Sequence, residues 1–313
     1  MTDLSLIIPV YNEAQSLPFL FEGIRDALDG YDHEVILVDD GSADGSFEEI
    51  IRLAEDNPRI RAISFKRNFG QTAAINAGIH AAQGEIIVLM DSDLENDPAD
   101  IPRLLDKLDD GFDVVSGWRQ DRWQGQYLTR KLPSRMANRL ISWSSGVPLN
   151  DYGCTLKAYR SSVIKDVALY GQMHRFIPVY CSWQGGKVGE LPVNYRPRRF
   201  GKSNYGLFRT YKVILDLLLL RFLERFMTKP IHFFGGVGFL SFFMAALTSL
   251  MAIYFKVWGD KDFIQTPLPI LAGVFFMVGV VMILMGILAE MITRTYYETQ
   301  PKTTYAIKRT VNL

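Results

Sequence analysis

Two carboxylates, Asp91 and Asp93, follow an apolar run and are the strongest chemical signal in this chain. The run Ile86–Met90 is apolar without interruption, which is typical of a strand buried on both faces of a sheet. Open α/β sheets bind their ligands at the carboxyl ends of such strands. Mg²⁺ typically takes one or two carboxylates together with nucleotide phosphates, so Asp91-Ser92-Asp93 predicts a metal-bridged diphosphate. The alternative is a solvated acidic turn that caps a helix beginning near Pro98.

Polar groups also follow two other predicted strands. Tyr11-Asn12-Glu13 follows the apolar segment Leu4–Val10, and Asp39-Asp40-Gly41-Ser42 follows Glu34–Val38. Because the carboxyl ends of parallel strands share one edge of a sheet, we expect these groups to converge on one crevice. An aspartate there can accept the ring N–H of a nucleotide base. No GxGxxG sequence follows the first strand and no P-loop sequence occurs, which weighs against a dinucleotide cofactor and excludes a P-loop.

The first 200 residues alternate strand-like and helix-like segments. This alternation is typical of an α/β fold with a parallel sheet and crossover helices. The predicted strands are 4–10, 34–38, 60–65, 85–90, 113–117, 154–159 and 189–195, and the predicted helices are 16–28, 46–54, 71–82 and 134–144.

Composition excludes several classes of protein. The 34 basic residues balance the 34 acidic ones, so no strong basic field argues for a nucleic-acid partner. The cysteines Cys154 and Cys181 form no metal-type spacing and fit a reducing compartment as buried small hydrophobes. The amino terminus has no basic n-region, so we expect this region to stay on the cytosolic side.

Two long segments without charge lie toward the carboxyl terminus. Ile231–Phe255 and Leu268–Ala289 contain no Asp, Glu, Lys or Arg, and each can cross a hydrocarbon core of about 30 Å. One such segment is also typical of a buried helix, but two in succession favour a membrane hairpin. Basic residues are more frequent beside the hairpin than in its loop, so the positive-inside rule places both termini in the cytoplasm. The flanking basic residues are Arg221, Arg225, Lys229, Arg294, Lys302, Lys308 and Arg309.

The segment before the hairpin is rich in Leu and Phe but interrupted by charge. Its charged residues fall on two different arcs at helical spacing, which favours two short interfacial helices over one straight helix. The alternative is a core helix of the soluble domain. The sequence thus predicts a catalytic domain at 1–204, juxtamembrane helices at 205–229, two transmembrane helices at 230–291 and a cytoplasmic tail at 292–313.

Several of these motifs together resemble an inverting glycosyltransferase of family 2. The resemblance rests on Pro9–Glu13, Asp39–Ser42, Asn76-Ala77-Gly78, Asp91–Asp93, Asn150–Cys154, His174–Pro178 and Arg198-x-x-Gly201-x-Ser203. It implies a GT-A nucleotide-sugar-binding domain, Rossmann-like with a mainly parallel sheet. With the apolar tail, the chain resembles the polyprenyl-phosphate glycosyltransferases, which include dolichol-phosphate mannose synthases and bacterial undecaprenyl-phosphate relatives.

The resemblance also implies roles for individual residues. Asp93, Asp151 and Arg198 are the predicted catalytic residues, with Arg198 on phosphate. Asp151 is either a base or a residue with a structural or sugar-binding role. The predicted nucleotide-binding residues are Pro9, Tyr11, Glu13, Asp40, Asp91 and Ser92, and the predicted ligands of Mg²⁺ or Mn²⁺ are Asp91, Asp93 and Glu95.

Two positions depart from the family pattern. Glu95 stands where the family often has Gln, and this change adds a negative charge beside the diphosphate. Ser203 is followed by Asn204 where a Lys is common, so Lys202 or Arg199 would supply the missing cation.

The acceptor implied by the resemblance is a polyprenyl phosphate. A phosphate monoester has a second pKa of about 6, so at neutral pH it attacks without first giving up a proton. The residues predicted to bind its phosphate are Arg122, Arg130, Arg135, Arg175, Lys202 and Ser203, within a basic region that also holds Arg119, Lys131 and Arg139. The alternative for this region is a solvated basic face or contact with anionic lipid headgroups.

The sequence therefore predicts metal-dependent hexose transfer from a nucleotide sugar to a polyprenyl phosphate at the cytoplasmic membrane face. UDP-glucose is the first expectation for the donor and GDP-mannose the second, and resemblance implies a homo-oligomer, a tetramer in relatives. One alternative is a processive polysaccharide synthase, although the Gln-x-x-Arg-Trp sequence of such enzymes is absent. Another is a nucleotide-sugar-binding membrane scaffold without catalysis.

Overall fold

The computed structural model describes residues 3–55, 57–122, 132–167, 169, 173–200, 231–259, 261–298 and 307–311. The chain divides into two compact units. Met1–Tyr211 together with Thr303–Leu313 is called the sheet unit here, and Lys212–Lys302 is called the hairpin unit. The predicted juxtamembrane helices at 205–229 lie outside the described residues.

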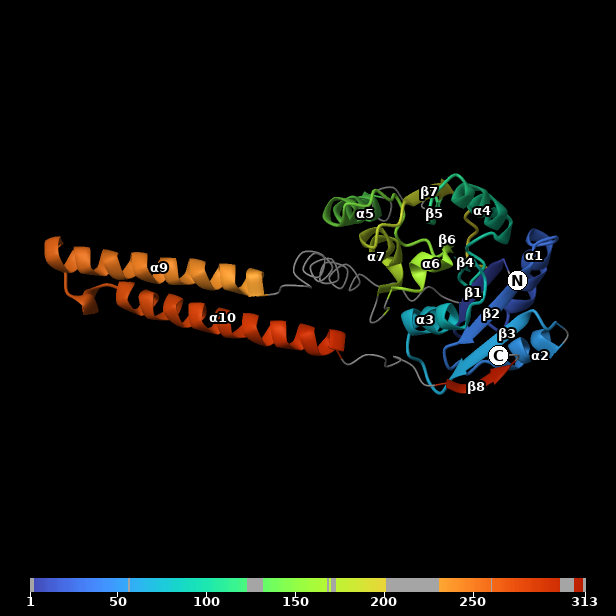
Figure 1. Ribbon diagram of the computed structural model, residues 1–313, viewed down its shortest axis with the longest axis horizontal. Helices are drawn as coiled ribbons and strands as arrows, with labels where there is room; N and C mark the ends of the chain where they lie inside the picture. Colours follow the sequence, from blue (N-terminus) through green and yellow to red (C-terminus); the bar gives the residue numbers. More distant parts are fainter. Residues whose placement is uncertain are drawn as a thin grey trace. The chain divides into compact units, whose positions relative to one another are not determined.

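The described residues of the sheet unit form one eight-stranded sheet in the order β7-β5-β6-β4-β1-β2-β3-β8 (Figure 1). The strands β4, β1, β2 and β3 run parallel, which confirms the predicted mainly parallel α/β sheet. β6 and β8 run antiparallel to their neighbours. The strands are β1 (Leu4–Val10), β2 (His33–Asp39), β3 (Ile60–Phe65), β4 (Ile86–Leu89), β5 (Val114–Trp118), β6 (Lys157–Arg160), β7 (Val188–Pro192) and β8 (Ile307–Val311).

Helices cover both faces of this sheet, because alternate side chains of a strand point to opposite sides. Ile8 of β1 packs in one core with Leu20 of α1, whereas Ile7 packs in the other with Ile75 of α3. A Cβ atom on Gly78 would collide with the Ile7 side chain, so glycine is required where α3 approaches β1. The helices are α1 (Leu17–Ala27), α2 (Ser46–Glu55), α3 (Gln71–Ala81), α4 (Ile101–Asp109), α5 (Leu132–Ser145), α6 (Ser161–Ile164) and α7 (Ile177–Trp183), with single 3₁₀ turns η1 (Pro98–Asp100) and η3 (Met173–Arg175).

The strand β8 is the main difference from the sequence-based expectation. Residues 292–313 were expected to form a tail, but Ile307–Val311 pairs antiparallel with the edge strand β3, with Arg309 opposite Ser64. Five residues with this composition carry a weak local strand signal, since β-propensity depends strongly on the neighbouring strand. The tail therefore belongs to the sheet unit and covers an edge that would otherwise expose unpaired backbone groups.

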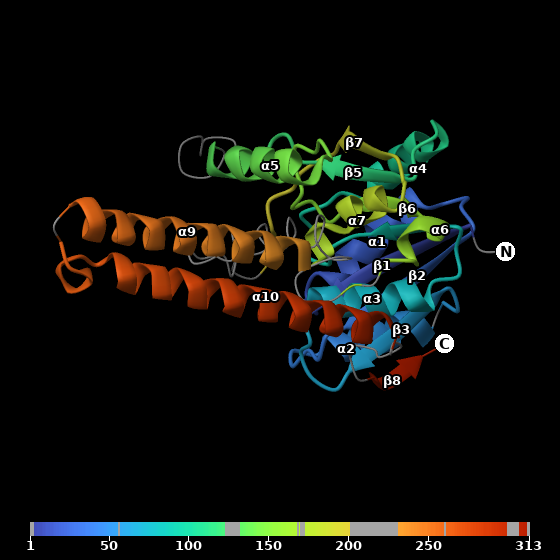
Figure 2. The same cartoon turned by 60° about the vertical axis from the view of Figure 1, so that its left-hand side comes forward.

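The described residues of the hairpin unit form two long helices, α9 (Ile231–Trp258) and α10 (Leu268–Glu298), joined through the 3₁₀ turn η4 (Phe263–Gln265). Both views show them side by side and antiparallel (Figures 1 and 2). The rings of Phe242 and Phe276 lie 5.4 Å apart between them. Gly238 faces the Gly279 carbonyl so closely that a Cβ atom would lie 3.1 Å from that oxygen. Small residues thus bring these helices together, as is typical of helix pairs in membranes.

Both helices are long and apolar enough to cross a membrane over His232–Trp258 and Leu268–Ile292. Their large side chains are mostly exposed, for example Phe239 at 70% and Leu250 at 65%. The core helices of a soluble protein would bury such side chains, and contiguous exposed apolar surface of this size marks a membrane or protein contact. The predicted hairpin is therefore present, and its surface is suited to lipid.

Candidate active site

The predicted polar motifs leave the sheet together at one edge, because β1 lies between β2 and β4. The Asn12 side chain accepts a hydrogen bond from Ala43 N–H at 2.9 Å, and the Asn12 N–H donates to Ser42 Oγ at 2.9 Å. These bonds join the loop after β1 to the loop after β2. Asn12 has φ 56°, a left-handed conformation that asparagine tolerates better than most residues.

Of the predicted nucleotide-binding residues, Tyr11 is 48% exposed and Asp40 only 4% exposed. Both oxygens of the Asp40 carboxylate accept backbone N–H groups, from Phe69 at 2.7 Å and from Gly70 at 2.9 Å. Burial raises the pKa of Asp40, and these two hydrogen bonds oppose that effect. Asp40 therefore fastens the end of β2 to the loop that begins α3. Its contact with a base stays a prediction.

Ser92 and Glu13 also connect the segments that leave this edge of the sheet. Ser92 is buried and donates from Oγ to the Pro9 carbonyl at 3.0 Å, so it ties the loop after β4 to β1. The Glu13 carboxylate accepts from Ser16 Oγ at 2.6 Å and lies 3.9 Å from Arg198 Nη1. Burial raises the pKa of Glu13, while the Ser16 bond and the Arg198 charge oppose the rise.

Asp91, Asp93 and Glu95, called the acidic rim here, line one pocket beyond the end of β4. Arg198 Nη2 lies 2.5 Å from Asp93 Oδ2, and Arg198 Nε lies 3.9 Å from Glu95 Oε1. Leu94 has φ 64°, and this left-handed conformation between Asp93 and Glu95 is costly for a branched side chain. The backbone thus bends where the two carboxylates must share the pocket.

Asp91 follows the carboxyl end of β4 and accepts two side-chain hydrogen bonds. Its Oδ1 accepts from Gln71 Nε2 at 2.7 Å and its Oδ2 accepts from Thr155 Oγ1 at 2.7 Å. Burial, followed by the charge of Asp93, raises the pKa of Asp91 to about 6. A cation at this position would relieve the repulsion, because it favours the ionised form of each carboxylate.

The donor set of the acidic rim fits a divalent cation only in part. Among the described residues, no group of three His, Cys, Asp or Glu side chains is gathered closely enough to hold a metal by itself. Glu95 is engaged with Arg119 at 3.6 Å and with Arg122 at 3.4 Å. Asp91 and Asp93 supply two hard oxygen donors, although Asp93 is itself paired with Arg198 at 2.5 Å. Two carboxylates suit an ion that completes its shell with phosphates and water.

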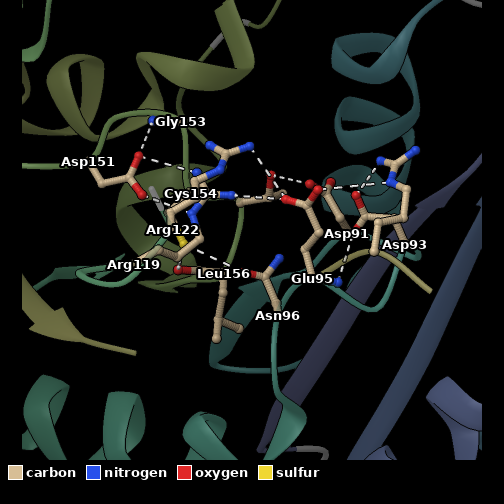
Figure 3. Close-up of polar contacts among 12 residues, drawn as sticks. Asp91, Asp93, Glu95, Asn96, Arg119, Arg122, Asp151, Gly153, Cys154 and Leu156 are labelled. Carbon is tan, nitrogen blue, oxygen red and sulfur yellow. Dashed lines mark hydrogen bonds and ion pairs between the residues drawn. The ribbon is translucent and has the colours of Figure 1, made fainter. Parts of the chain in front are cut away.

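A second charged group, the pair Arg119 and Asp151, lies deeper in the same crevice. Arg119 Nε lies 2.8 Å from Asp151 Oδ2, and Arg119 Nη2 lies 3.2 Å from Asp151 Oδ1. Figure 3 shows both arginines, Arg119 and Arg122, between Asp151 and the acidic rim. Burial alone would raise the pKa of Asp151, but the Arg119 charge and hydrogen bonds outweigh burial and lower it. Asp151 is therefore ionised at neutral pH and already paired.

The loop that carries Asp151 is fastened from two sides. Glu190 of β7 accepts from the Asn150 N–H at 2.8 Å and from the Asp151 N–H at 3.0 Å. Lys157 of β6 is 2% exposed and donates to the carbonyls of Tyr152 and Cys154. Sequence reasoning missed Glu190 and Lys157, together with Gln71 and Thr155, because these residues have no motif of their own.

The predicted phosphate-binding arginines fall into different surroundings. Arg122 and Arg175 line the pocket of the acidic rim, whereas Arg135 is exposed on α5. Arg119 is buried against Asp151, so it does not belong to an open basic face as the sequence suggested. Arg130, Lys131, Lys202 and Ser203 lie outside the described residues.

Two further groups are inert in acid–base terms. His174 Nδ1 lies 2.8 Å from Thr72 Oγ1, and burial lowers the pKa of His174 to about 3, so the ring is neutral. Burial raises the pKa of Cys154 to about 11 and that of Cys181 to about 12. Both cysteines are buried thiols, as the sequence predicted.

Comparisons with known proteins agree with this geometry. The family model "Glycosyl transferase family 2" matches residues 5–168. A dodecaprenyl-phosphate galacturonate synthase of Rhizobium johnstonii is 42% identical, over 98% of this chain and 92% of the relative. An undecaprenyl-phosphate 4-deoxy-4-formamido-L-arabinose transferase of Edwardsiella ictaluri is 36% identical, over 98% of this chain and 94% of the relative.

Solved structures show the same fold at lower sequence identity. A Mycobacterium tuberculosis glucosyl-3-phosphoglycerate synthase with Mn²⁺ and UDP-glucose has a TM-score of 0.54 and 19% identity, over 70% of this chain and 79% of that chain. The predicted GT-A fold is thereby confirmed. The chain belongs to glycosyltransferase family 2, and it is an enzyme of the group that transfers sugars to polyprenyl phosphates.

Proposed function

We propose that this enzyme transfers a galacturonate residue from a uridine diphosphate sugar to a polyprenyl phosphate, with inversion at the anomeric carbon. The proposal depends mainly on one pocket in which carboxylates lie next to arginines. The carboxylates could bind a cation, and the arginines could bind phosphate groups. The sugar is supported by the 42% identical relative, whose name specifies galacturonate. UDP-glucose and GDP-mannose, the donors expected from sequence, have no counterpart in the names of the two relatives.

The two sugars named for the relatives share a stereochemistry, and this limits the choice of donor sugar. Galacturonate and 4-deoxy-4-formamido-L-arabinose have the same configuration at C2, C3 and C4, with an axial heteroatom at C4. Glucose and mannose place the C4 hydroxyl equatorially. A site that hydrogen-bonds an axial substituent discriminates strongly against the epimer, because its polar groups are then left unpaired. We therefore expect a donor of galacto configuration.

A divalent cation, Mg²⁺ or Mn²⁺, fits the acidic rim as part of this proposal. Asp91 and Asp93 would hold the ion, with Glu95 at the outer side. The bound ion would supply charge stabilisation for the departing nucleoside diphosphate. The precedent is the fold neighbour solved with Mn²⁺ and UDP-glucose. Arg198, which pairs with Asp93 at 2.5 Å, lies where it can exchange that partner for a diphosphate oxygen.

The chemical step needs no strong base. A phosphate oxygen of the acceptor forms a bond to C1 of the sugar, and the bond from C1 to the diphosphate oxygen breaks. The acceptor is largely dianionic at neutral pH, since its second pKa is about 6. Asp151 is ionised and held by two bonds from Arg119, so we assign it the positioning of its loop and of Arg119. Arg122 and Arg175 are the described residues proposed to bind the acceptor phosphate.

We further propose that the sheet unit and both termini lie on the cytoplasmic side. Support comes from β8, which follows the hairpin in sequence yet pairs with β3 of the sheet unit. The chain must therefore return to the side from which it entered the bilayer, and two crossings achieve this. The excess of basic residues beside the hairpin selects the cytoplasm by the positive-inside rule.

The test measures how much lipid-extractable product the purified enzyme forms in nanodiscs. Labelled UDP-galacturonate, UDP-glucuronate, UDP-glucose and GDP-mannose would each be incubated with undecaprenyl phosphate and Mg²⁺, Mn²⁺ or EDTA. We expect label in the lipid phase with UDP-galacturonate and a divalent cation only. Equal transfer from UDP-glucuronate would reject the axial C4 requirement. Undiminished transfer in EDTA would reject the metal.

A further inference from the structure

Helix α5 carries an exposed apolar stripe that the transferase reaction does not use. Met136 is 66% exposed and Trp143 is 77% exposed. Among the described residues of the sheet unit, these are the large hydrophobic residues whose exposed fraction is greater than one half. Leu132 adds a third at 38%. At about 100° per residue, Leu132, Met136 and Trp143 fall within an arc of about 40° on the helix.

Positive charge adjoins this stripe. Arg135 and Arg139 are both exposed and lie one turn apart on one flank of the stripe. A helix face that combines a tryptophan, long aliphatic side chains and arginines is suited to the boundary between headgroups and acyl chains. Anionic lipid headgroups attract such arginines near the membrane surface. The alternative source of phosphate, a single acceptor lipid, does not explain the apolar stripe.

The opposite face of α5 is bonded to the loop that carries Asp151. Asn138 Nδ2 donates to the Asn150 carbonyl at 2.5 Å, and Ser142 Oγ donates to the Leu149 carbonyl at 3.1 Å. Ser145 Oγ lies 3.1 Å from Tyr152 Oη. The helix therefore connects an exposed surface to the crevice through three contacts spread over about two turns. Figure 2 shows α5 on the outside of the sheet unit, on the side of β5 and β7.

We propose that the Leu132–Met136–Trp143 stripe of α5 docks on the headgroup layer of an anionic bilayer and so holds the Asp151 loop at the membrane surface. The occupant is lipid because the same chain continues into a hairpin with a lipid-suited surface, and because the arginines beside the stripe complement anionic headgroups. The docking places the crevice where the phosphate of a membrane lipid is found. The inference goes beyond the transfer reaction and concerns how the sheet unit meets its acceptor.

The direct test measures the depth of α5 in a bilayer. Met136→Cys would carry a nitroxide label in the full-length protein in nanodiscs of phosphatidylcholine and phosphatidylglycerol. Cys154 and Cys181 are buried, so the reagent reacts at the introduced thiol. Arg25→Cys, on a side chain that is 77% exposed on α1, is the matched control. We expect oxygen to collide more often than a water-soluble nickel complex with the label at 136, and the reverse at 25.

Two results overturn the proposal. Water-like collision rates at both sites would show that α5 faces solvent. A label at 136 that is shielded from both reagents and broadened by a second label would show that another copy of the chain covers α5. The Trp143→Cys variant repeats the measurement if the first variant folds poorly.

A functional readout separates this proposal from the proposed reaction. Met136→Asp and Trp143→Asp place a charge in the stripe, and we expect each to raise KM for undecaprenyl phosphate in nanodiscs on the order of tenfold. Activity with a short-chain, water-dispersed polyprenyl phosphate stays at the wild-type level. Equal losses with both acceptors would reject membrane docking as the cause. Because the collision measurement needs no turnover, it decides the docking even if the donor or acceptor proves to be different.

Discussion

The crevice contains two sets of carboxylates that differ in how their charge is compensated. Asp151, with 13% of its side chain exposed, receives two hydrogen bonds from Arg119, at 2.8 and 3.2 Å, so its charge is neutralised within the fold. Asp91, in the acidic rim, has only neutral hydrogen-bond donors, Gln71 and Thr155, and lies beside two more carboxylates. The pKa of Asp151 is lowered, whereas that of Asp91 is raised to about 6.

This difference distinguishes charges that are paired within the fold from charges that are available to bind a ligand. A buried pair with complementary geometry is costly to break, but it offers nothing to a substrate. The raised pKa of Asp91 shows that its charge is unfavourable in the ligand-free fold, and a bound cation would stabilise that charge, which is typical of binding sites. The comparison supports the proposal that Arg119 and Asp151 serve stability and loop position, and that Asp91 and Asp93 hold the cation. Four experiments test it, from the largest expected effect to the smallest.

Replacement of Arg119 by Met is expected to cause the largest effect, on stability. Asp151 would remain buried without its partner, so we expect the free energy of unfolding to fall by about 3–5 kcal/mol. Denaturant unfolding of the sheet unit, followed by tryptophan fluorescence, measures it. The double variant Arg119→Met/Asp151→Leu should recover most of the loss, and Arg25→Met, at an exposed pair, should stay near wild type. A normal free energy of unfolding for Arg119→Met would contradict the structural assignment.

Replacement of Asp93 by Asn is expected to reduce transfer by about 10²–10³-fold, the usual cost of removing one group that stabilises a developing charge. Stability should change little, because removal of a like charge next to Asp91 is offset by weakening of the ion pair between Asp93 and Arg198. The amount of lipid-extractable label measures the rate of transfer, and denaturant unfolding measures the stability. Asp109→Asn, on a side chain that is 74% exposed, is the control. Wild-type turnover in Asp93→Asn would remove this residue from the catalytic set.

The acidity of Asp91 predicts a pH dependence of opposite sign for stability and for metal affinity. Its pKa is about 6 in the folded chain and near 3.8 when unfolded, so between these values the folded chain binds more protons. Without metal, stability therefore rises as pH falls from 7 toward 4. Metal affinity falls about tenfold per pH unit below 6, because the ion must displace a proton.

Comparison of wild type with Asp91→Asn isolates this contribution from those of Glu13 and Asp40, whose pKa values are also raised. Thermal unfolding in EDTA at pH 7 and pH 5 gives the stability. Titration with Mn²⁺ over the same range gives the affinity. A wild-type pH profile that Asp91→Asn reproduces would contradict the assignment.

Replacement of Glu95 by Gln, the residue common in the family, should have the smallest effect. Glu95 contacts Arg119 and Arg122 at 3.6 and 3.4 Å, which are long distances for ion pairs. We expect kcat/KM to change by less than about fivefold, the equivalent of roughly 1 kcal/mol for one weak pair. A hundredfold loss of kcat/KM would instead identify Glu95 as an essential metal ligand, with the same role as Asp91 and Asp93.

Most strands of the sheet unit and the position of the crevice can be predicted from the sequence. The apolar runs of β1, β3 and β4 matched their strands closely, because a buried parallel strand is a continuous apolar segment bounded by turn residues. The polar motifs after β1, β2 and β4 do converge, since strand ends in a parallel sheet share an edge. The pairing of β8 with β3 was missed, because a short strand at a sheet edge is defined by its partner rather than by its own residues.

The sequence by itself determined the order of strands and helices, the two apolar spans and the positions where acidic groups leave the sheet, because these features depend on local periodicity. Only the tertiary structure decided which charge each carboxylate meets. Arg119 and Asp151 are separated by 32 residues, and Arg198 and Asp93 by 105. Burial and charge act over a few ångströms of space, regardless of separation along the chain. They pair the charge of Asp151 within the fold and leave Asp91 beside other carboxylates, where we propose that a cation binds.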